Sequence, residues 1–124
     1  NSGGQKFWSW YGFESRVEWC ACFASWCAEQ SGMVASGQVL KFSSCAVGAS
    51  WFQGQGRWKG KGYTPSAGDF IFFDWNKDGQ VDHVGIVVNV ANGRVNTIEG
   101  NTSNMVARRS YQLGGIVIVG YGYI

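Results

Sequence analysis

Three features are scarce in this sequence of 124 residues, and each scarcity excludes a class of protein. No apolar stretch approaches the roughly 20 residues that a membrane-spanning helix needs. The net charge is only +2 and no basic run occurs, which excludes a strong electrostatic nucleic-acid binder. Proline occurs once, and no low-complexity linker or repeat interrupts the chain. We therefore expect one domain over residues 1–124, and its start at Asn1 rather than Met indicates a piece of a longer protein.

Apolar and aromatic residues are plentiful by contrast. Hydrophobic residues make up 45% of the chain, enough for a packed core and too many for a disordered protein. Seven tryptophans exceed what a small core needs, so we expect some aromatic rings to line a groove, with core packing as the alternative for each. The aromatic candidates are Trp8, Trp10, Tyr11, Trp19, Trp51 and Trp58.

The first half of the chain contains one clear helical pattern. Trp19, Phe23 and Trp26 recur at the spacing of one helix face. The helix is predicted to begin near Cys20 and to stop near Gly32, because glycine is typical of helix C-termini.

The segments around this helix carry weaker signals. Residues 1–18 are expected to be an irregular lead-in, and residues 34–42 are compatible with a short helix. Residues 54–62 mix glycine with Arg57, Lys59 and Lys61, and we expect a basic, solvated loop there.

The second half of the chain changes to strand periodicity. Valine, isoleucine and phenylalanine dominate five short runs that are separated by turn dipeptides such as Asp78-Gly79 and Asn92-Gly93. The predicted strands are residues 69–73, 83–90, 94–98, 105–109 and 116–121. A helix followed by an antiparallel meander is an α+β domain.

Four cysteines occur, at a spacing that does not match the paired ligands of a zinc site. Buried apolar packing is the expected role of Cys22, Cys27 and Cys45, with a Cys27–Cys45 disulfide as an alternative in an oxidising compartment. Cys20 differs because it lies at the predicted start of a helix. Unpaired amides and the positive end of the helix dipole favour the thiolate there, and the thiolate is the nucleophilic form.

The only histidine and a polar group near a strand end could complete a catalytic set with Cys20. His83 opens a predicted strand, and Glu99 and Asn101 lie at the end of the next one. A thiol nucleophile needs a base within hydrogen-bond reach, and the base needs a third group that fixes its orientation. The predicted roles are nucleophile for Cys20, base for His83 and orienting groups for Glu99 and Asn101.

Four segments in this order resemble the CHAP family, the cysteine, histidine-dependent amidohydrolases/peptidases of the papain-like superfamily beside the NlpC/P60 enzymes. They are WCACFASWCAEQSG, TPSAGDFIFFDW, DHVGIVVNV and IEGN. The resemblance extends over nearly the whole chain and implies a papain-like fold, with an N-terminal helix carrying the nucleophile packed on a C-terminal antiparallel sheet. It places the family's nucleophile at Cys20, its base at His83 and its orienting groups at Glu99 and Asn101.

The function that this resemblance implies is peptidoglycan hydrolysis through a cysteine acyl-enzyme. The bond would be the N-acetylmuramoyl–L-alanine amide or a peptide bond, and the parent protein a phage lysin, an autolysin or a conjugative-element hydrolase. Peptidoglycan is then the expected partner of a monomeric domain with wall-targeting modules elsewhere in the parent protein, acting outside the cell or in the wall. The alternatives are a papain-like acyltransferase and a catalytically silent wall-binding module.

A second motif lies just before His83. Its oxygen-bearing residues alternate as in the first nine positions of an EF-hand loop, at Asp74, Asn76, Asp78, Gln80 and Asp82. The closing glutamate of such a loop is replaced by Gly85, and Lys77 adds a positive charge. A structural calcium ion is one interpretation and a plain turn is the other; the chemistry itself is expected to need no cofactor.

Overall fold

The computed structural model describes residues 3–124 as three helices followed by a sheet of six strands. The helices are α1 (Gln5–Tyr11), α2 (Cys20–Gln30) and α3 (Cys45–Gly54). The strands are β1 (Trp58–Gly60), β2 (Phe70–Phe73), β3 (His83–Ala91), β4 (Arg94–Thr102), β5 (Met105–Gln112) and β6 (Ile118–Gly122). The predicted α+β class is confirmed.

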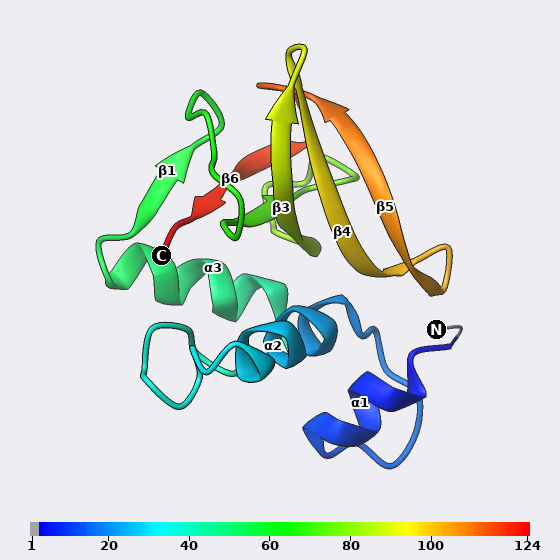
Figure 1. Ribbon diagram of the computed structural model, residues 1–124. Coiled ribbons are helices and arrows are strands. Elements are labelled where there is room, and N and C mark those ends of the chain that lie inside the picture. The colour runs from blue at the N-terminus through cyan, green and yellow to red at the C-terminus, as the bar shows by residue number, and fades with distance from the viewer. Residues whose placement is uncertain (1–2) are drawn as a thin grey trace.

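The sheet is antiparallel throughout, in the order β1-β6-β2-β3-β4-β5. Figure 1 shows the sheet curled, with the three helices gathered together beneath it. Asn92 and Gly93 both have positive φ, of 55° and 73°, which is the geometry of the tight turn that joins β3 to β4. No helix in the described residues is long and apolar enough to cross a membrane.

Helix α2 is buried on two faces. Small side chains, among them Ala21, Ala24 and Ala28, pack in one core cluster with α3 and with Phe70 and Phe72 of β2. The opposite face carries Trp19 and Phe23, whose rings pack against Phe7 of α1. Alanines allow the helix to approach the sheet closely, and the helix ends as predicted, just before Gly32 with its φ of +78°.

A second core lies on the other face of the curled sheet. Along β3 the residues alternate, so that Val84 and Ile86 contact the helix side while Val87 contacts the second core. His83 shares the face of Val87, and its ring packs beside Phe73 at a centroid distance of 5.7 Å. His83 thus lies beside the second core at the start of β3, where the strand meets the start of α2.

Two expectations for the first half of the chain differ from the structure, and one helix was not predicted. The lead-in forms α1, which Gly4 precedes in the left-handed conformation at φ 69°. Residues 34–42 form a turn and an irregular segment rather than a helix. Helix α3 was not predicted because two glycines and a valine lower its helix propensity. Ser44, whose side chain accepts a hydrogen bond from the Val47 amide, is the start signal that could have revealed it.

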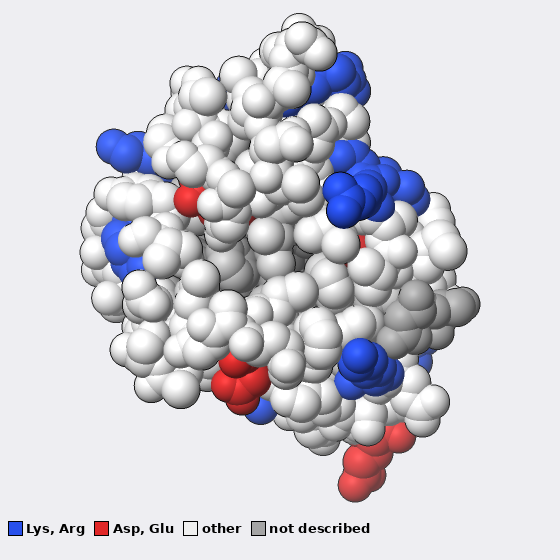
Figure 2. Space-filling model, in the orientation of Figure 1, with Lys and Arg blue, Asp and Glu red and all other residues white. Residues whose placement is uncertain are grey.

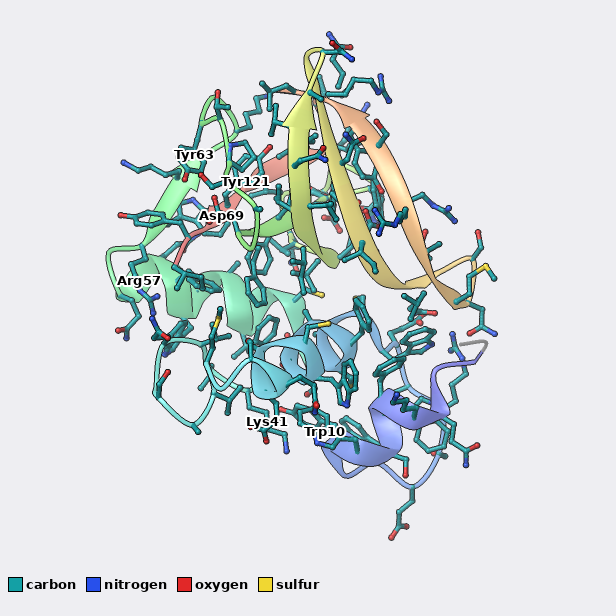
Figure 3. The ribbon with its side chains drawn as sticks, in the orientation of Figure 1. Trp10, Lys41, Arg57, Tyr63, Asp69 and Tyr121 are labelled. Carbon is teal, nitrogen blue, oxygen red and sulfur yellow. The ribbon has the colours of Figure 1, made fainter. Side chains whose placement is uncertain are left out.

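The basic residues beside the helices have structural contacts. Figure 3 shows Lys41 next to Trp10, and the Lys41 Nζ lies 4.6 Å from the centroid of that ring. Arg57 lies over the Trp51 ring and donates to the Gln38 carbonyl at 2.6 Å. Part of the predicted basic loop is thus ordered by aromatic contacts, and its residues 58–60 form β1 rather than a loop.

Candidate active site

Cys20 is the first residue of α2 and lies at the place where the helices meet the sheet. Its side chain is 5% exposed, and its Sγ lies 3.3 Å from the Sγ of Cys45. The hydrogen bond with Cys45 is the largest cause of a pKa lowered to about 5; burial opposes it, and His83 and the Val84 amide lower the pKa further. The free amides at the start of the helix favour the same charged form.

His83 is the first residue of β3 and links the thiol to a carboxylate. Its Nε2 lies 2.8 Å from Glu99 Oε1, so Nδ1 is the ring nitrogen that this carboxylate leaves free. Burial disfavours the imidazolium, but the hydrogen bonds with Cys20 and Glu99 prevail and raise the pKa of His83 to about 9. Between these two pKa values the pair is a thiolate and an imidazolium.

Glu99 of β4 is fully buried and has three hydrogen-bond partners. Besides His83, its carboxylate accepts from the Thr97 hydroxyl at 2.5 Å and from the Tyr111 hydroxyl at 2.8 Å. Burial alone would favour the neutral acid, yet the hydrogen bonds and the charge of His83 lower the pKa of Glu99. The carboxylate is therefore held ionised in a site without water exposure.

Gly85 makes room for this carboxylate. A Cβ at position 85 would lie 2.6 Å from Cγ of Glu99, a distance at which something must shift. Gly85 lies two residues after His83 on the same face of β3, so a side chain there would displace the acid that holds the imidazole. The residue that breaks the EF-hand pattern thus has a packing reason to be glycine.

Three of the four predicted catalytic residues come together, and Asn101 does not. His83 Nε2 lies 2.8 Å from Glu99 Oε1, and Cys20 and His83 are close enough to shift each other's pKa. Asn101 instead donates to Glu18 and accepts from Arg16 on the segment before α2. In this position it ties β4 to that segment instead of orienting the imidazole.

Comparison with protein families agrees with this geometry. The model of the CHAP domain matches residues 10–101, which include Cys20, His83 and Glu99. The chain belongs to the CHAP family. A comparison with curated proteins finds no match.

Two solved structures share the fold of this CHAP domain. Both are crystal structures of Ly7917, one of them with the hydrolyzing product of MDP, and each aligns with a TM-score of 0.57. The sequence identities are 22% and 20%, and each alignment covers 82% of the present chain. The CHAP domain spans about half of Ly7917, with 52% and 51% of that chain covered.

The acidic loop of this CHAP domain folds as a turn that uses its own backbone. Asp74 accepts from the amides of Asp78 and Gly79, and Asp82 accepts from the amide of Trp75. Within residues 3–124 no three Asp, Glu, His or Cys side chains form a group that could hold a metal ion. The calcium site therefore stays a prediction from the sequence pattern.

Three residues of the site were not predicted. Thr97 and Tyr111 are the two other donors to Glu99, and Cys45 contacts Cys20 rather than Cys27. Thr97 lies two residues before Glu99 and so on the same strand face, which is the one signal that sequence spacing offers. Tyr111 and Cys45 come from other elements, and no local pattern connects them to the site.

An exposed aromatic ring beside the site comes from the acidic loop and is not one of the predicted candidates. Trp75 is 42% exposed, stacks on Phe73 at 4.6 Å and lies 5.5 Å from His83 between ring centroids. Trp19, one of the predicted groove residues, is fully buried. The acidic loop thus places one accessible ring next to the imidazole.

The charged side chains lie away from the middle of the face drawn in Figure 2. That view shows an uncharged, hollowed centre with basic residues grouped at its right.

An apolar hollow lies between α2 and β3, lined by Cys27, Ala28, Ser31, Met33, Gly68, Phe70 and Ile86. A separate polar groove of about 380 Å³ lies on β3, β4 and β5 and includes Arg108 and Arg109.

Proposed function

We propose that this CHAP domain is a peptidoglycan hydrolase that cleaves an amide bond through the thiolate of Cys20. The observation that carries the proposal is the placement of His83 between the Cys20 thiol, which raises the pKa of the imidazole, and the buried Glu99, whose Oε1 lies 2.8 Å from Nε2. A thiolate with a pKa near 5 and an imidazolium with a pKa near 9 coexist at neutral pH. These are the two forms that attack on an amide and protonation of its nitrogen require.

The first half of the reaction forms an acyl-enzyme. The Cys20 thiolate attacks the amide carbonyl carbon, and the oxyanion forms beside the amides at the start of α2, that of Cys20 among them. His83 then donates its proton from the ring nitrogen that faces Cys20 to the departing nitrogen, and the carbon–nitrogen bond breaks. Glu99 keeps the ring oriented and stabilises its charge until that transfer.

The second half of the reaction releases the acid. Neutral His83 takes a proton from a water molecule, and the oxygen of that water attacks the thioester carbonyl. The carbon–sulfur bond breaks, and Cys20 leaves as the thiolate beside the renewed imidazolium. No metal or organic cofactor is needed for any of these steps.

Three observations support peptidoglycan as the substrate class. The chain belongs to a family that the sequence resemblance associates with cell-wall amides, and Ly7917, which has the same fold, crystallised with the hydrolyzing product of MDP. The exposed Trp75 ring beside His83 suits contact with the apolar face of a sugar or peptide. We propose accordingly that the domain acts in the wall or outside the cell, as part of a lysin or autolysin.

The decisive experiment compares wild type with Cys20→Ala and with Cys27→Ala on purified cell walls. Cys20→Ala is expected to reduce clearing at least about 1,000-fold with unchanged circular dichroism, while Cys27→Ala keeps activity. Mass spectrometry of the released fragments identifies the new amino terminus and hence the amide that is cut. Equal clearing by wild type and Cys20→Ala would overturn the proposal, and transfer of the acyl group to an added amine would assign the acyltransferase instead.

A further inference from the structure

The start of α3 brings a second thiol to the proposed nucleophile. Cys45 is the first residue of α3, as Cys20 is of α2, so both sulfurs lie at helix N-termini. The two Sγ atoms are 3.3 Å apart, and both side chains are buried, at 5% and 8% exposure. Neither cysteine is in a disulfide.

A disulfide bond requires the sulfurs to approach to about 2.05 Å, so the gap to be closed is roughly 1.2 Å. Both side chains are short, and each sulfur already points to the other. Cys22 and Cys27 lie in a different core cluster, on the α1 side of α2. The arrangement therefore offers Cys20 one thiol partner among the three other cysteines.

We propose that Cys20 and Cys45 form a reversible disulfide when a peroxide oxidises the enzyme, and that this bond switches the active site off. The oxidation of the pair depends only on the two thiols, whereas the loss of activity rests on the proposed role of Cys20 as nucleophile. Cys45 is then the resolving cysteine of the site.

The chemistry balances in two steps. The Cys20 thiolate attacks one oxygen of hydrogen peroxide, the oxygen–oxygen bond breaks, and the departing hydroxide takes the proton of His83 to leave as water. Cys45 then attacks the sulfenic sulfur of Cys20, so that a sulfur–sulfur bond forms, the sulfur–oxygen bond breaks, and a second water leaves with the proton of Cys45. Two thiols and one peroxide thus give one disulfide and two waters.

The charge state of each sulfur suits its role in these two reaction steps. The pKa of Cys20 is lowered, so this sulfur is the thiolate that reacts with peroxide at neutral pH. The pKa of Cys45 is raised, first by its hydrogen bond to Cys20 and then by burial, so that Cys45 keeps its proton while Cys20 is charged. Conversion of Cys20 to a neutral sulfenic acid removes the negative charge that holds this proton in place.

The test oxidises the fully reduced protein with hydrogen peroxide and measures both the covalent state and the clearing of cell walls. In wild type, peptide mapping is expected to show one cross-link, between Cys20 and Cys45, and a mass loss of two hydrogen atoms. Clearing should fall at least about tenfold and return after dithiothreitol.

Variants separate this disulfide from general oxidation damage. Cys45→Ser is compared with its own reduced activity and is expected to accumulate sulfinic acid at Cys20, with no recovery after dithiothreitol. Cys27→Ala should form the same cross-link as wild type. A cross-link that includes Cys22 or Cys27, or oxidation of wild type without any cross-link, would overturn the proposal.

The two proposals fail in different ways. If the cross-link forms but the reduced enzyme does not clear walls, the proposed function is wrong and the oxidation site stands. If the reduced enzyme clears walls and the cross-link leaves this activity unchanged, the switch is wrong.

Discussion

Two acidic regions flank His83 along the chain, and their carboxylates differ in burial and in hydrogen-bond partners. Glu99 is fully buried and accepts hydrogen bonds from His83, Thr97 and Tyr111. The carboxylates of the loop before His83 accept hydrogen bonds from that loop's own amides, and residues 75–80 of this loop are exposed. One region binds a histidine and the other closes a turn.

The difference shows that the number of carboxylates in a segment says little about its chemistry. The loop has three aspartates in nine residues, whereas the site has a single glutamate. Burial and side-chain donors give Glu99 a lowered pKa and couple it to His83. The loop carboxylates accept hydrogen bonds from backbone amides and have no histidine among their hydrogen-bond partners in the described residues.

The largest effect is expected from removing one charge in each region. Glu99→Gln keeps the volume but removes the charge that holds the imidazolium, so kcat/KM for wall clearing should fall at least about 100-fold. Asp78→Asn is the matched control in the exposed loop and should stay within about twofold of wild type. Similar losses of kcat/KM in both variants would contradict a specific role for the buried carboxylate.

The pH dependence of kcat/KM is a second way to measure the effect of the Glu99 charge on His83. Wild-type kcat/KM should rise as the Cys20 thiol ionises near pH 5 and fall as His83 loses its proton near pH 9. Because a neutral amide stabilises the imidazolium less than a carboxylate does, the basic limb of Glu99→Gln should move to lower pH. An unmoved basic limb would show that Glu99 does not raise the pKa of His83.

A smaller loss is expected where the space for Glu99 is filled. In Gly85→Ala the new Cβ meets Cγ of Glu99 at 2.6 Å, so the carboxylate must move away from His83. We expect kcat/KM to fall about tenfold or more and the free energy of unfolding to fall by about 1–3 kcal/mol.

The matched control for this substitution is Gly60→Ala. Gly60 is also a strand glycine, but a Cβ there has no neighbour within 4 Å. Its activity should equal that of wild type. If both alanine variants lose activity alike, the effect comes from strand glycines in general and not from the space beside Glu99.

Removing one of the three donors to Glu99 should have a milder effect. Tyr111→Phe leaves the ring packed beside Phe73 and deletes only the hydroxyl that donates to Glu99 at 2.8 Å. A hydrogen bond to a buried charged group contributes about 1.5–3 kcal/mol, so urea unfolding should show a loss in this range. Activity should fall only a few-fold, since Thr97 and His83 still hold the carboxylate. An unchanged unfolding free energy would contradict the assigned contact.

The smallest effect is expected from calcium. Since the loop carboxylates already accept backbone hydrogen bonds and do not converge, neither EDTA nor added calcium should shift the melting temperature or the rate of wall clearing. A rise in melting temperature with calcium that Asp78→Asn abolishes would show that the loop rearranges into the site its sequence pattern predicts.

The sequence predicted the sheet half of the domain better than the helical half. Strands separated by Asp-Gly and Asn-Gly turns have strong local signals, and β3 begins at His83 as expected. Helix α3 contains two glycines, and α1 consists largely of aromatics, so neither has the propensity or the period that identifies a helix. Their stability comes from tertiary packing, which periodicity does not reveal.

Within the site, the sequence predicted the groups that local signals mark. Cys20 lies at a predicted helix start, and His83 and Glu99 lie near predicted strand ends. The contact of Cys45 with Cys20 and that of Tyr111 with Glu99 depend on how separate elements pack, and Asn101 was assigned to the imidazole although it bonds the segment before α2. These contacts are set by the arrangement of elements in space and have no signature along the chain.

The three groups of the site come from the starts of α2 and β3 and from the far half of β4. A nascent chain that ends before β4 has formed therefore contains the thiol and the imidazole but lacks the acid that fixes them. A protease cut that releases α2 from the sheet separates the same groups. The proposed chemistry consequently depends on a fold that is complete through β4 and in which α2 stays attached to the sheet.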